Sequence, residues 1–260
     1  MKKYLLVFQL SLKEILAYRL DFAIHLLKYA GMVITMIFVW QAVQIAGGQM
    51  IYSYSEMVSY FVLAAIIYSL SNFHPFYIED DIRLGGLNKY LLKPISPLSY
   101  YFAFEAAIAV MEVIIKVIVF LPLAYISGYQ LHSSPVNLFL TCLYLPCIFI
   151  FSMHLLSIIS LLAFWITQAA AVRWSLLIVF RFLAGLLVPI SFFPTYLQQI
   201  FVYLPFEYLA YVPIQIMLNK LSTTTALQGL GILLFWIGAA WIIKQLVWQR
   251  GLQLYEGVGV

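Results

Sequence analysis

Apolar segments long enough to cross a lipid bilayer dominate this sequence and restrict it to folds in which lipid is the solvent. A bilayer core needs about 20 apolar residues in a helix. Six segments meet that requirement, at about 22–45, 57–73, 100–127, 136–166, 174–190 and 226–246. Charged residues make up 9% of the chain, against roughly 25% in a globular domain. We therefore expect an all-α integral membrane protein with six transmembrane helices.

The residues before the first apolar segment, 1–21, follow a different pattern. Their apolar residues recur at spacings of three and four, with lysines on other faces: Leu5, Phe8, Leu12 and Ile15. That spacing predicts an amphipathic helix at the membrane interface. Charged residues interrupt the segment before any long apolar run, so we do not expect a cleavable signal. Residues 22–260 are expected to form a single six-span membrane domain.

Lysines and arginines gather on one side of the predicted membrane. Six spans put four segments on that side: 1–21, 74–99, 167–173 and 247–260. These segments hold nine basic residues, whereas Lys220 is alone on the other side. Because basic residues favour the cytoplasmic side, both termini are predicted to be cytoplasmic. The net charge of +4 thus reflects orientation in the membrane, and no nucleic-acid partner is expected.

A strongly charged insert, residues 76–97, interrupts the apolar segments on the cytoplasmic side. Its acidic residues come early, and Lys89 and Lys93 come late, which suits a helix dipole at both ends. Gly85-Gly86 indicates a bend, because each glycine costs a helix roughly 1 kcal/mol. Four leucines offer an apolar face to a groove on a soluble partner: Leu84, Leu87, Leu91 and Leu92. The alternative is a solvated loop with ordinary charges.

A proline-rich segment, residues 191–217, lies on the opposite side between the last two spans. It is mostly apolar and aromatic, yet three prolines divide it: Pro194, Pro205 and Pro213. Each proline interrupts a helix, and pieces of about 10 residues are too short to span a bilayer. The pattern predicts re-entrant helical stubs in the outer leaflet, with a plain external loop as the alternative.

Ionisable residues inside the spans are costly and mark structural ties or transport paths. Glu105, Glu112 and Lys116 share one helix face by their spacings of seven and four. Glu112 precedes Lys116 by four residues, the favourable order for an ion pair. The pair would be a structural tie or line a polar path. Arg181 needs a partner, with Glu105 and Glu112 as candidates, and would serve structure or contact substrate.

These features together resemble the type-2 ABC exporter permeases. Two motifs also resemble the bacterial branch of compact six-helix permeases that work with a separately encoded ATPase. The first is Asp81-Ile-Arg83-Leu-Gly85-Gly-Leu87, continued by Tyr90-Leu-Leu92-Lys-Pro94. The second is the tail motif, Trp248-Gln-Arg250-Gly251-Leu-Gln-Leu-Tyr255-Glu-Gly257-Val-Gly259. With the hydropathy profile, the resemblance covers nearly the whole chain.

The resemblance implies a permease subunit in a bacterial inner membrane, with a cytoplasmic coupling helix at about Glu79–Leu92. Nine residues would dock the ATPase: Glu79, Asp80, Asp81, Arg83, Leu84, Gly85, Leu87, Leu91 and Leu92. It also implies two ATPase copies, which bind ATP and magnesium, and a second permease, identical or homologous. No glycine is followed by lysine, so the chain lacks the phosphate-binding loop of an ATPase. We expect no enzyme activity, metal or cofactor in this chain.

Spans two and five face the partner permease in such exporters, which suggests a substrate path. The residues concerned are Tyr60, Tyr68, Asn72, Phe180 and Arg181. An apolar cavity there would suit an amphipathic or hydrophobic substrate: a drug, toxin, peptide or lipid-like molecule. Two other classes compete with an ABC exporter. A self-sufficient secondary transporter or channel would favour inverted repeats with paired broken helices, and a membrane enzyme would need clustered catalytic residues.

Overall fold

The chain folds into a bundle of helices. The computed structural model describes residues 2–17, 19–46, 51–71, 76–126, 133–166 and 169–255, and all its regular elements there are helices. The longer ones are α1 (Lys2–Ala17), α2 (Arg19–Ile45), α3 (Tyr54–Tyr68), α6 (Pro97–Ile126), α7 (Pro135–Leu161), α8 (Ala169–Leu183) and α11 (Thr223–Leu254). The shorter ones are α4 (Phe76–Arg83), α5 (Asn88–Leu91), α9 (Thr195–Phe201), α10 (Tyr211–Met217) and the 3-10 turns η1 (Leu162–Phe164), η2 (Ile190–Phe192) and η3 (Glu207–Leu209). The predicted all-α class is confirmed.

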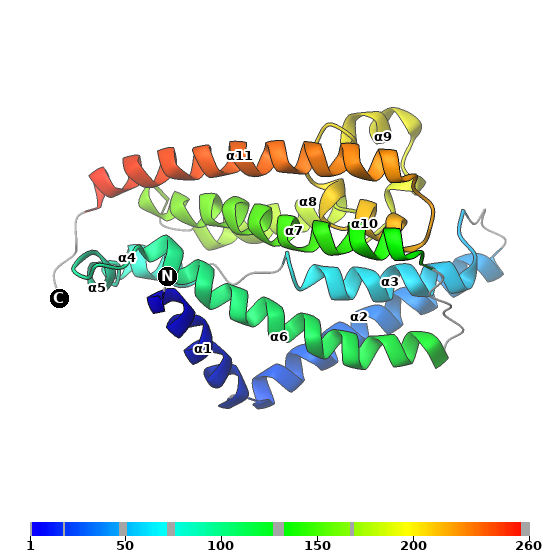
Figure 1. Cartoon of the computed structure of the whole chain (residues 1–260), viewed down its shortest axis with the longest axis horizontal. Helices are drawn as coiled ribbons and strands as arrows, with labels where there is room; N and C mark the ends of the chain where they lie inside the picture. The colour runs from blue at the N-terminus through cyan, green and yellow to red at the C-terminus, as the bar shows by residue number, and fades with distance from the viewer. Residues whose placement is uncertain are drawn as a thin grey trace.

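Helix α7 forms the centre of the bundle. It is apolar around its whole circumference and packs against α11, α10, α8 and α4. Figure 1 shows α11 above α7, with α3, α6 and α2 below it. The charged insert, α4 and α5, lies at the same end of the bundle as the C-terminus, and α9 and α10 lie towards the other end (Figure 1). The charged insert and the proline-rich segment are thus far apart.

Helix starts follow local capping signals. Ser53 accepts a hydrogen bond from the backbone N–H of Glu56, and the Glu56 carboxylate accepts one from the Ser53 N–H, a capping box that starts α3. Ser134 caps α7 ahead of Pro135 in the first turn, and Ser222 caps α11. Because α3 begins at Tyr54, it starts three residues before the predicted span at 57.

Two helices among the described residues are long and apolar enough to cross a membrane by length and composition. They are Pro135–Phe164 and Thr223–Leu254, with peak mean hydropathies of 2.3 and 1.9. Helices α3 and α8 have 15 residues each, or about 22 Å at 1.5 Å per residue. That is shorter than a hydrocarbon core of roughly 30 Å. Helices overlie all six predicted spans, but six crossings remain a prediction.

The predicted span at 174–190 is not one helix, because α8 ends at Leu183. Gly185 has φ +77°, a conformation that favours glycine. The Leu186 N–H donates to the Arg181 carbonyl at 3.0 Å, and the Gly185 N–H donates to the Phe182 carbonyl at 3.1 Å. These two bonds form a Schellman motif, which terminates a helix. The end of α8 could have been predicted from the sequence, because Gly185 stands shortly before Pro189.

The proline-rich segment is divided into short helices, as expected, but only two of its prolines separate them. Pro194 caps α9, and Pro205 lies between α9 and η3. Pro213 lies in the first turn of α10, where a backbone N–H would have no acceptor within the helix. A proline at this position therefore removes no helical hydrogen bond. The expectation that Pro213 breaks a helix is therefore wrong. Gln215 of α10 is buried and donates to the Tyr52 hydroxyl at 2.9 Å.

The N-terminal helix is confirmed as a helix and lies against α6. Phe8 and Leu12 are half-buried, whereas Leu5 is exposed, and the side chain of Ile15 lies outside the described residues. The Lys3 ammonium donates to the Pro94 carbonyl, and the Ser96 N–H donates to the Tyr4 hydroxyl at 3.2 Å. Helix α1 is thereby fixed to the end of the charged insert. It ends at Ala17, four residues before the predicted boundary at 21.

Candidate functional site

The charged insert forms two short helices joined by a tight bend. Helix α4 ends at Arg83, and α5 begins at Asn88. Gly85 has φ +78°, which a side chain would disfavour. Gly86 approaches Asp81 so closely that a Cβ atom would collide with the carboxylate. The bend predicted from Gly85-Gly86 is confirmed, and the segment 79–92 is a bent pair of helices instead of one.

Asp81 holds the bend together. Its Oδ1 atom accepts a hydrogen bond from the Lys89 ammonium at 2.7 Å, and its Oδ2 atom accepts one from the Tyr101 hydroxyl. Partial burial lowers the pKa of Lys89, but the hydrogen bond to Asp81 and the nearby Asp81 and Tyr90 together outweigh it, so that pKa lies above its ordinary value. One carboxylate therefore links α4, α5 and the start of α6.

The leucines of the insert divide between its outside and its inside. Leu84, Leu91 and Leu92 are 75%, 44% and 88% exposed, whereas Leu87 is fully buried. Leu87 belongs to an internal cluster with Ile78, Ile82, Tyr101 and Leu161. It therefore does not contribute to the exposed apolar face. Asp80 and Arg83 are exposed beside that face.

A buried ion pair joins the insert to α8. The Arg173 Nε atom lies 3.3 Å from Glu79 Oε2, and both side chains are almost fully buried. Arg83, one turn after Glu79, approaches its other oxygen at 4.0 Å. Because Glu79 is 2% exposed, it is not available on the surface for docking. Its position makes it a tie between the insert and the bundle.

The tail motif packs on Phe164, the last residue of η1. The Phe164 ring lies 6.1 Å from Trp248 and 6.2 Å from Tyr255, between ring centroids. Gly251 gives this ring its space, since a Cβ atom there would collide with Phe164. Trp248 and Tyr255 also pack on the cluster that contains Leu87. The two motifs of the family resemblance thus meet in one structural unit.

The three charged residues of α6, which were predicted to share one helix face, are buried. Lys116 Nζ lies 2.8 Å from Glu112 Oε2, and both side chains are buried. Glu105, seven residues before Glu112 on the same helix face, is buried as well. The ring of Tyr68, from α3, lies 5.8 Å from the Lys116 ammonium and 4.8 Å from the Arg181 guanidinium. These contacts make Tyr68 a bridge between α6 and α8.

The proposed substrate-path residues divide into two places. Tyr68, Phe180 and Arg181 line a cavity of about 30 Å³ together with Ser71 and Ser152. A volume of that size holds about one water molecule, and ligand pockets run to roughly 300–1,000 Å³.

Tyr60 lies apart from this cavity, fully buried, and its hydroxyl donates to the Gly185 carbonyl at 2.6 Å. Its position supports the end of α8. Phe180, which lines the cavity, also stacks on Phe206 with centroids 4.9 Å apart. Asn72 lies outside the described residues. The path remains a prediction.

A second buried polar contact was missed by sequence reasoning. Lys244 Nζ of α11 lies 3.3 Å from His154 Nδ1 of α7, and both residues are buried. Each is a polar residue inside an apolar run, and this pattern indicates that each needs a polar partner. Nothing in either run indicates that the two face each other, since they are 90 residues apart.

A comparison with known protein families covers almost the whole chain. The family described as "ABC-2 family transporter protein" matches residues 26–259. The chain belongs to the ABC-2 transporter family. The resemblance to type-2 ABC permeases is thereby confirmed, and this ABC-2 family member is a component of a membrane transporter. Neither the curated proteins nor the solved structures contain a significant match.

Members of the ABC-2 family typically act with ABC ATPases. The charged insert of this ABC-2 chain is bonded to α6 through Asp81 and to α8 through Glu79. The cluster around its Leu87 also packs against Trp248 of α11. A force applied to the exposed leucines would therefore reach three long helices.

Proposed function

We propose that this chain is the permease subunit of an ATP-driven exporter and that a separate ATPase docks on its charged insert. The observation behind the proposal is the division of the insert into an exposed leucine face and a firmly bonded inner face. Hydrolysis in a partner moves membrane helices only through a rigid connection. The buried Glu79–Arg173 pair and the Asp81 hydrogen bonds supply that rigidity.

The proposed assembly has two permeases and two ATPases in a bacterial inner membrane. The second permease is a copy of this chain or a homologue, and the ATPases bind ATP and magnesium. Each permease crosses the membrane six times, with α3 and α8 extended by non-helical residues, and the proline-rich segment re-enters the outer leaflet. The substrate is amphipathic or hydrophobic. Because the cavity beside Arg181 has a volume of only about 30 Å³, substrate passage requires it to widen.

The docking proposal predicts that charges on the exposed leucines release the ATPase. The double change Leu84→Asp and Leu92→Asp puts two carboxylates where the partner groove would bury them. Burial of an unpaired charge costs several kcal/mol, so we expect at least about a 100-fold loss of affinity. The measurement is co-purification of the ATPase with the tagged chain from detergent-solubilised membranes.

Leu254→Asp is the matched control, because Leu254 is a 56% exposed leucine at the same end of the molecule but outside the insert. It should keep the ATPase bound. Unchanged co-purification and transport in the Leu84→Asp/Leu92→Asp variant would contradict the docking proposal. Transport that persists without any ATPase would favour the self-sufficient transporter.

The orientation is tested with cysteines at two exposed positions on α11. In a Cys142→Ser/Cys147→Ser background, Thr223→Cys should react with a membrane-impermeant maleimide in intact cells. Gln253→Cys should react only after the cells are permeabilised, because the basic residues gather on its side of the membrane. The opposite labelling pattern would reverse the proposed topology.

A further inference from the structure

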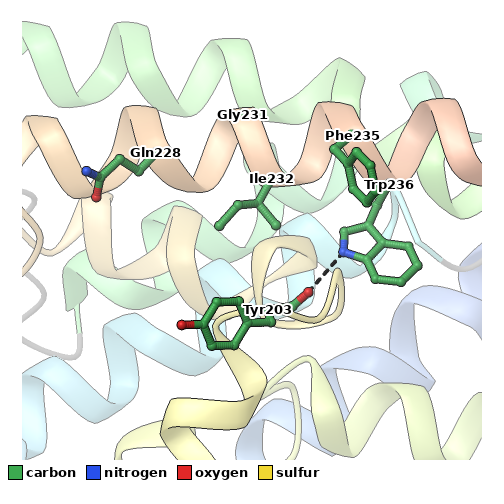
Figure 2. A pocket seen from close by; sticks show the side chains of 6 residues that line it. All are labelled: Tyr203, Gln228, Gly231, Ile232, Phe235 and Trp236. Atoms are coloured by element: carbon green, nitrogen blue, oxygen red, sulfur yellow. Dashed lines mark hydrogen bonds between the residues drawn. The ribbon is translucent and has the colours of Figure 1, made fainter.

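A groove of about 610 Å³ lies between Tyr203 and the first half of α11 (Figure 2). Its lining residues are Tyr203, Gln228, Gly231, Ile232, Phe235 and Trp236. The volume falls within the range of roughly 300–1,000 Å³ that ligand pockets occupy. The groove is open to the surroundings of the protein, since Tyr203 is 76% and Phe235 70% exposed.

The groove is polar at one end and apolar along the rest. Figure 2 shows the Gln228 amide and the Tyr203 hydroxyl at one end and the Trp236 indole at the other. The indole Nε1–H donates to the Tyr203 carbonyl at 3.0 Å, which closes the apolar end. From Gln228 to Trp236 the helix rises about 12 Å at 1.5 Å per residue. The groove thus follows α11 for about two turns.

Gly231 keeps this groove open. A Cβ atom at Gly229 would collide with Tyr208 and Tyr144, so close packing inside the chain accounts for that glycine. At Gly231, apart from its sequence neighbours and the backbone of its own helix, no heavy atom of the described residues lies within 4 Å of where a Cβ would stand. A glycine inside a helix costs roughly 1 kcal/mol relative to alanine. Packing among the residues that the structure describes offers no compensation for this cost at Gly231.

The position of the groove indicates what surrounds it. Helix α11 has the length and hydropathy of a membrane-crossing helix. Within the predicted span at 226–246, Gln228 lies about 3 Å and Trp236 about 15 Å from residue 226, at 1.5 Å per residue. In a hydrocarbon core of roughly 30 Å, those depths run from near one interface to the middle. A lipid has the same gradient of polarity, with its polar headgroup at the interface and its acyl chains deeper in the membrane.

We propose that the groove binds one acyl chain of an outer-leaflet glycerophospholipid. The headgroup and ester region lie beside the Gln228 amide and the Tyr203 hydroxyl, and the chain runs over Gly231 to Phe235 and Trp236. The lipid site is independent of the substrate and of the ATPase. It requires that α11 crosses the membrane and rests on the proposed orientation, with Thr223 at the outer side.

The test uses the full chain in phosphatidylethanolamine vesicles that contain a trace of the same lipid with a diazirine midway along one acyl chain. After illumination and proteolysis, the label should concentrate at Tyr203, Phe235 and Trp236. Gly231→Phe fills the groove and should lower this labelling roughly tenfold, equivalent to about 1.4 kcal/mol of binding free energy. Gly238→Phe is the matched control, since Gly238 is also free of contacts and lies two turns along the same helix face. Its labelling should equal that of the wild type.

A second probe needs no variant. A diazirine placed next to the headgroup should label the Gln228 end, whereas the mid-chain diazirine labels the Trp236 end. An even distribution of label along α11 with both probes would overturn the proposal. So would equal labelling in the wild type and Gly231→Phe. Efficient crosslinking between two copies that carry Gly231→Cys would overturn it as well, and would assign the groove to a protein interface.

Discussion

Replacing Arg173 by methionine is expected to destabilise the folded chain by about 3–5 kcal/mol, the usual effect of breaking a buried ion pair. Glu79 is 2% exposed and would lose its partner at 3.3 Å. Its contact with Arg83 is longer, at 4.0 Å, and partly exposed. The expected result is a lower melting temperature in detergent and a smaller monodisperse peak in size-exclusion chromatography.

Two further variants separate the buried pair from a general effect of charge loss. Arg83→Met removes a half-exposed charge and should cost no more than about 1 kcal/mol. The double variant Glu79→Met/Arg173→Met should regain most of the stability, because apolar replacement of both members of a buried pair is often neutral. Wild-type stability in Arg173→Met would show that the pair does not hold the insert to α8.

Gly251→Leu is expected to separate the tail motif from the charged insert. The Phe164 ring occupies the space that any side chain at this position requires. Overpacking of a filled site costs about 1–3 kcal/mol, and the collision occurs near the end of α11, where the helix can fray. Faster trypsin cleavage after Arg250 and a lower melting temperature would report the change.

The control is Gly238→Leu on the same helix, where a Cβ atom meets nothing within 4 Å. It should leave both measurements unchanged. Adding Phe164→Ala to Gly251→Leu should restore part of the stability, because it vacates the contested space. If Gly251→Leu alone behaves as the wild type, Phe164 has another position available and the tail is not fixed by this contact.

The local features of the fold were readable from the sequence. Helix α7 begins at Pro135 after its Ser134 cap, the insert bends at Gly85-Gly86, and α8 ends at Leu183, just before Gly185. Each feature depends on residues within a few positions of one another, because caps and glycine conformations act over a single turn. The pairing of Glu112 with Lys116 could be predicted for the same reason, because residues four apart are neighbours on a helix.

The surroundings of Arg181 show where local reasoning stops. The cost of an arginine inside a membrane predicted that it needs a partner, with the two carboxylates of α6 as candidates, and that pairing stays a prediction. The structure also brings the ring of Tyr68 to 4.8 Å from the guanidinium. An aromatic face attracts a cation, but no spacing in the sequence relates a tyrosine of α3 to an arginine of α8.

The sequence by itself determined the helical class, the membrane environment, the bend of the insert and the family resemblance, because hydropathy and turn chemistry are properties of short segments. Only the tertiary structure decided which insert residues face outwards. Leu84 and Leu87 are three residues apart, yet one is exposed and the other buried against Leu161. Glu79 meets Arg173 across 94 positions. Those outcomes depend on how distant helices pack, since burial is set by whichever surface arrives from elsewhere in the chain.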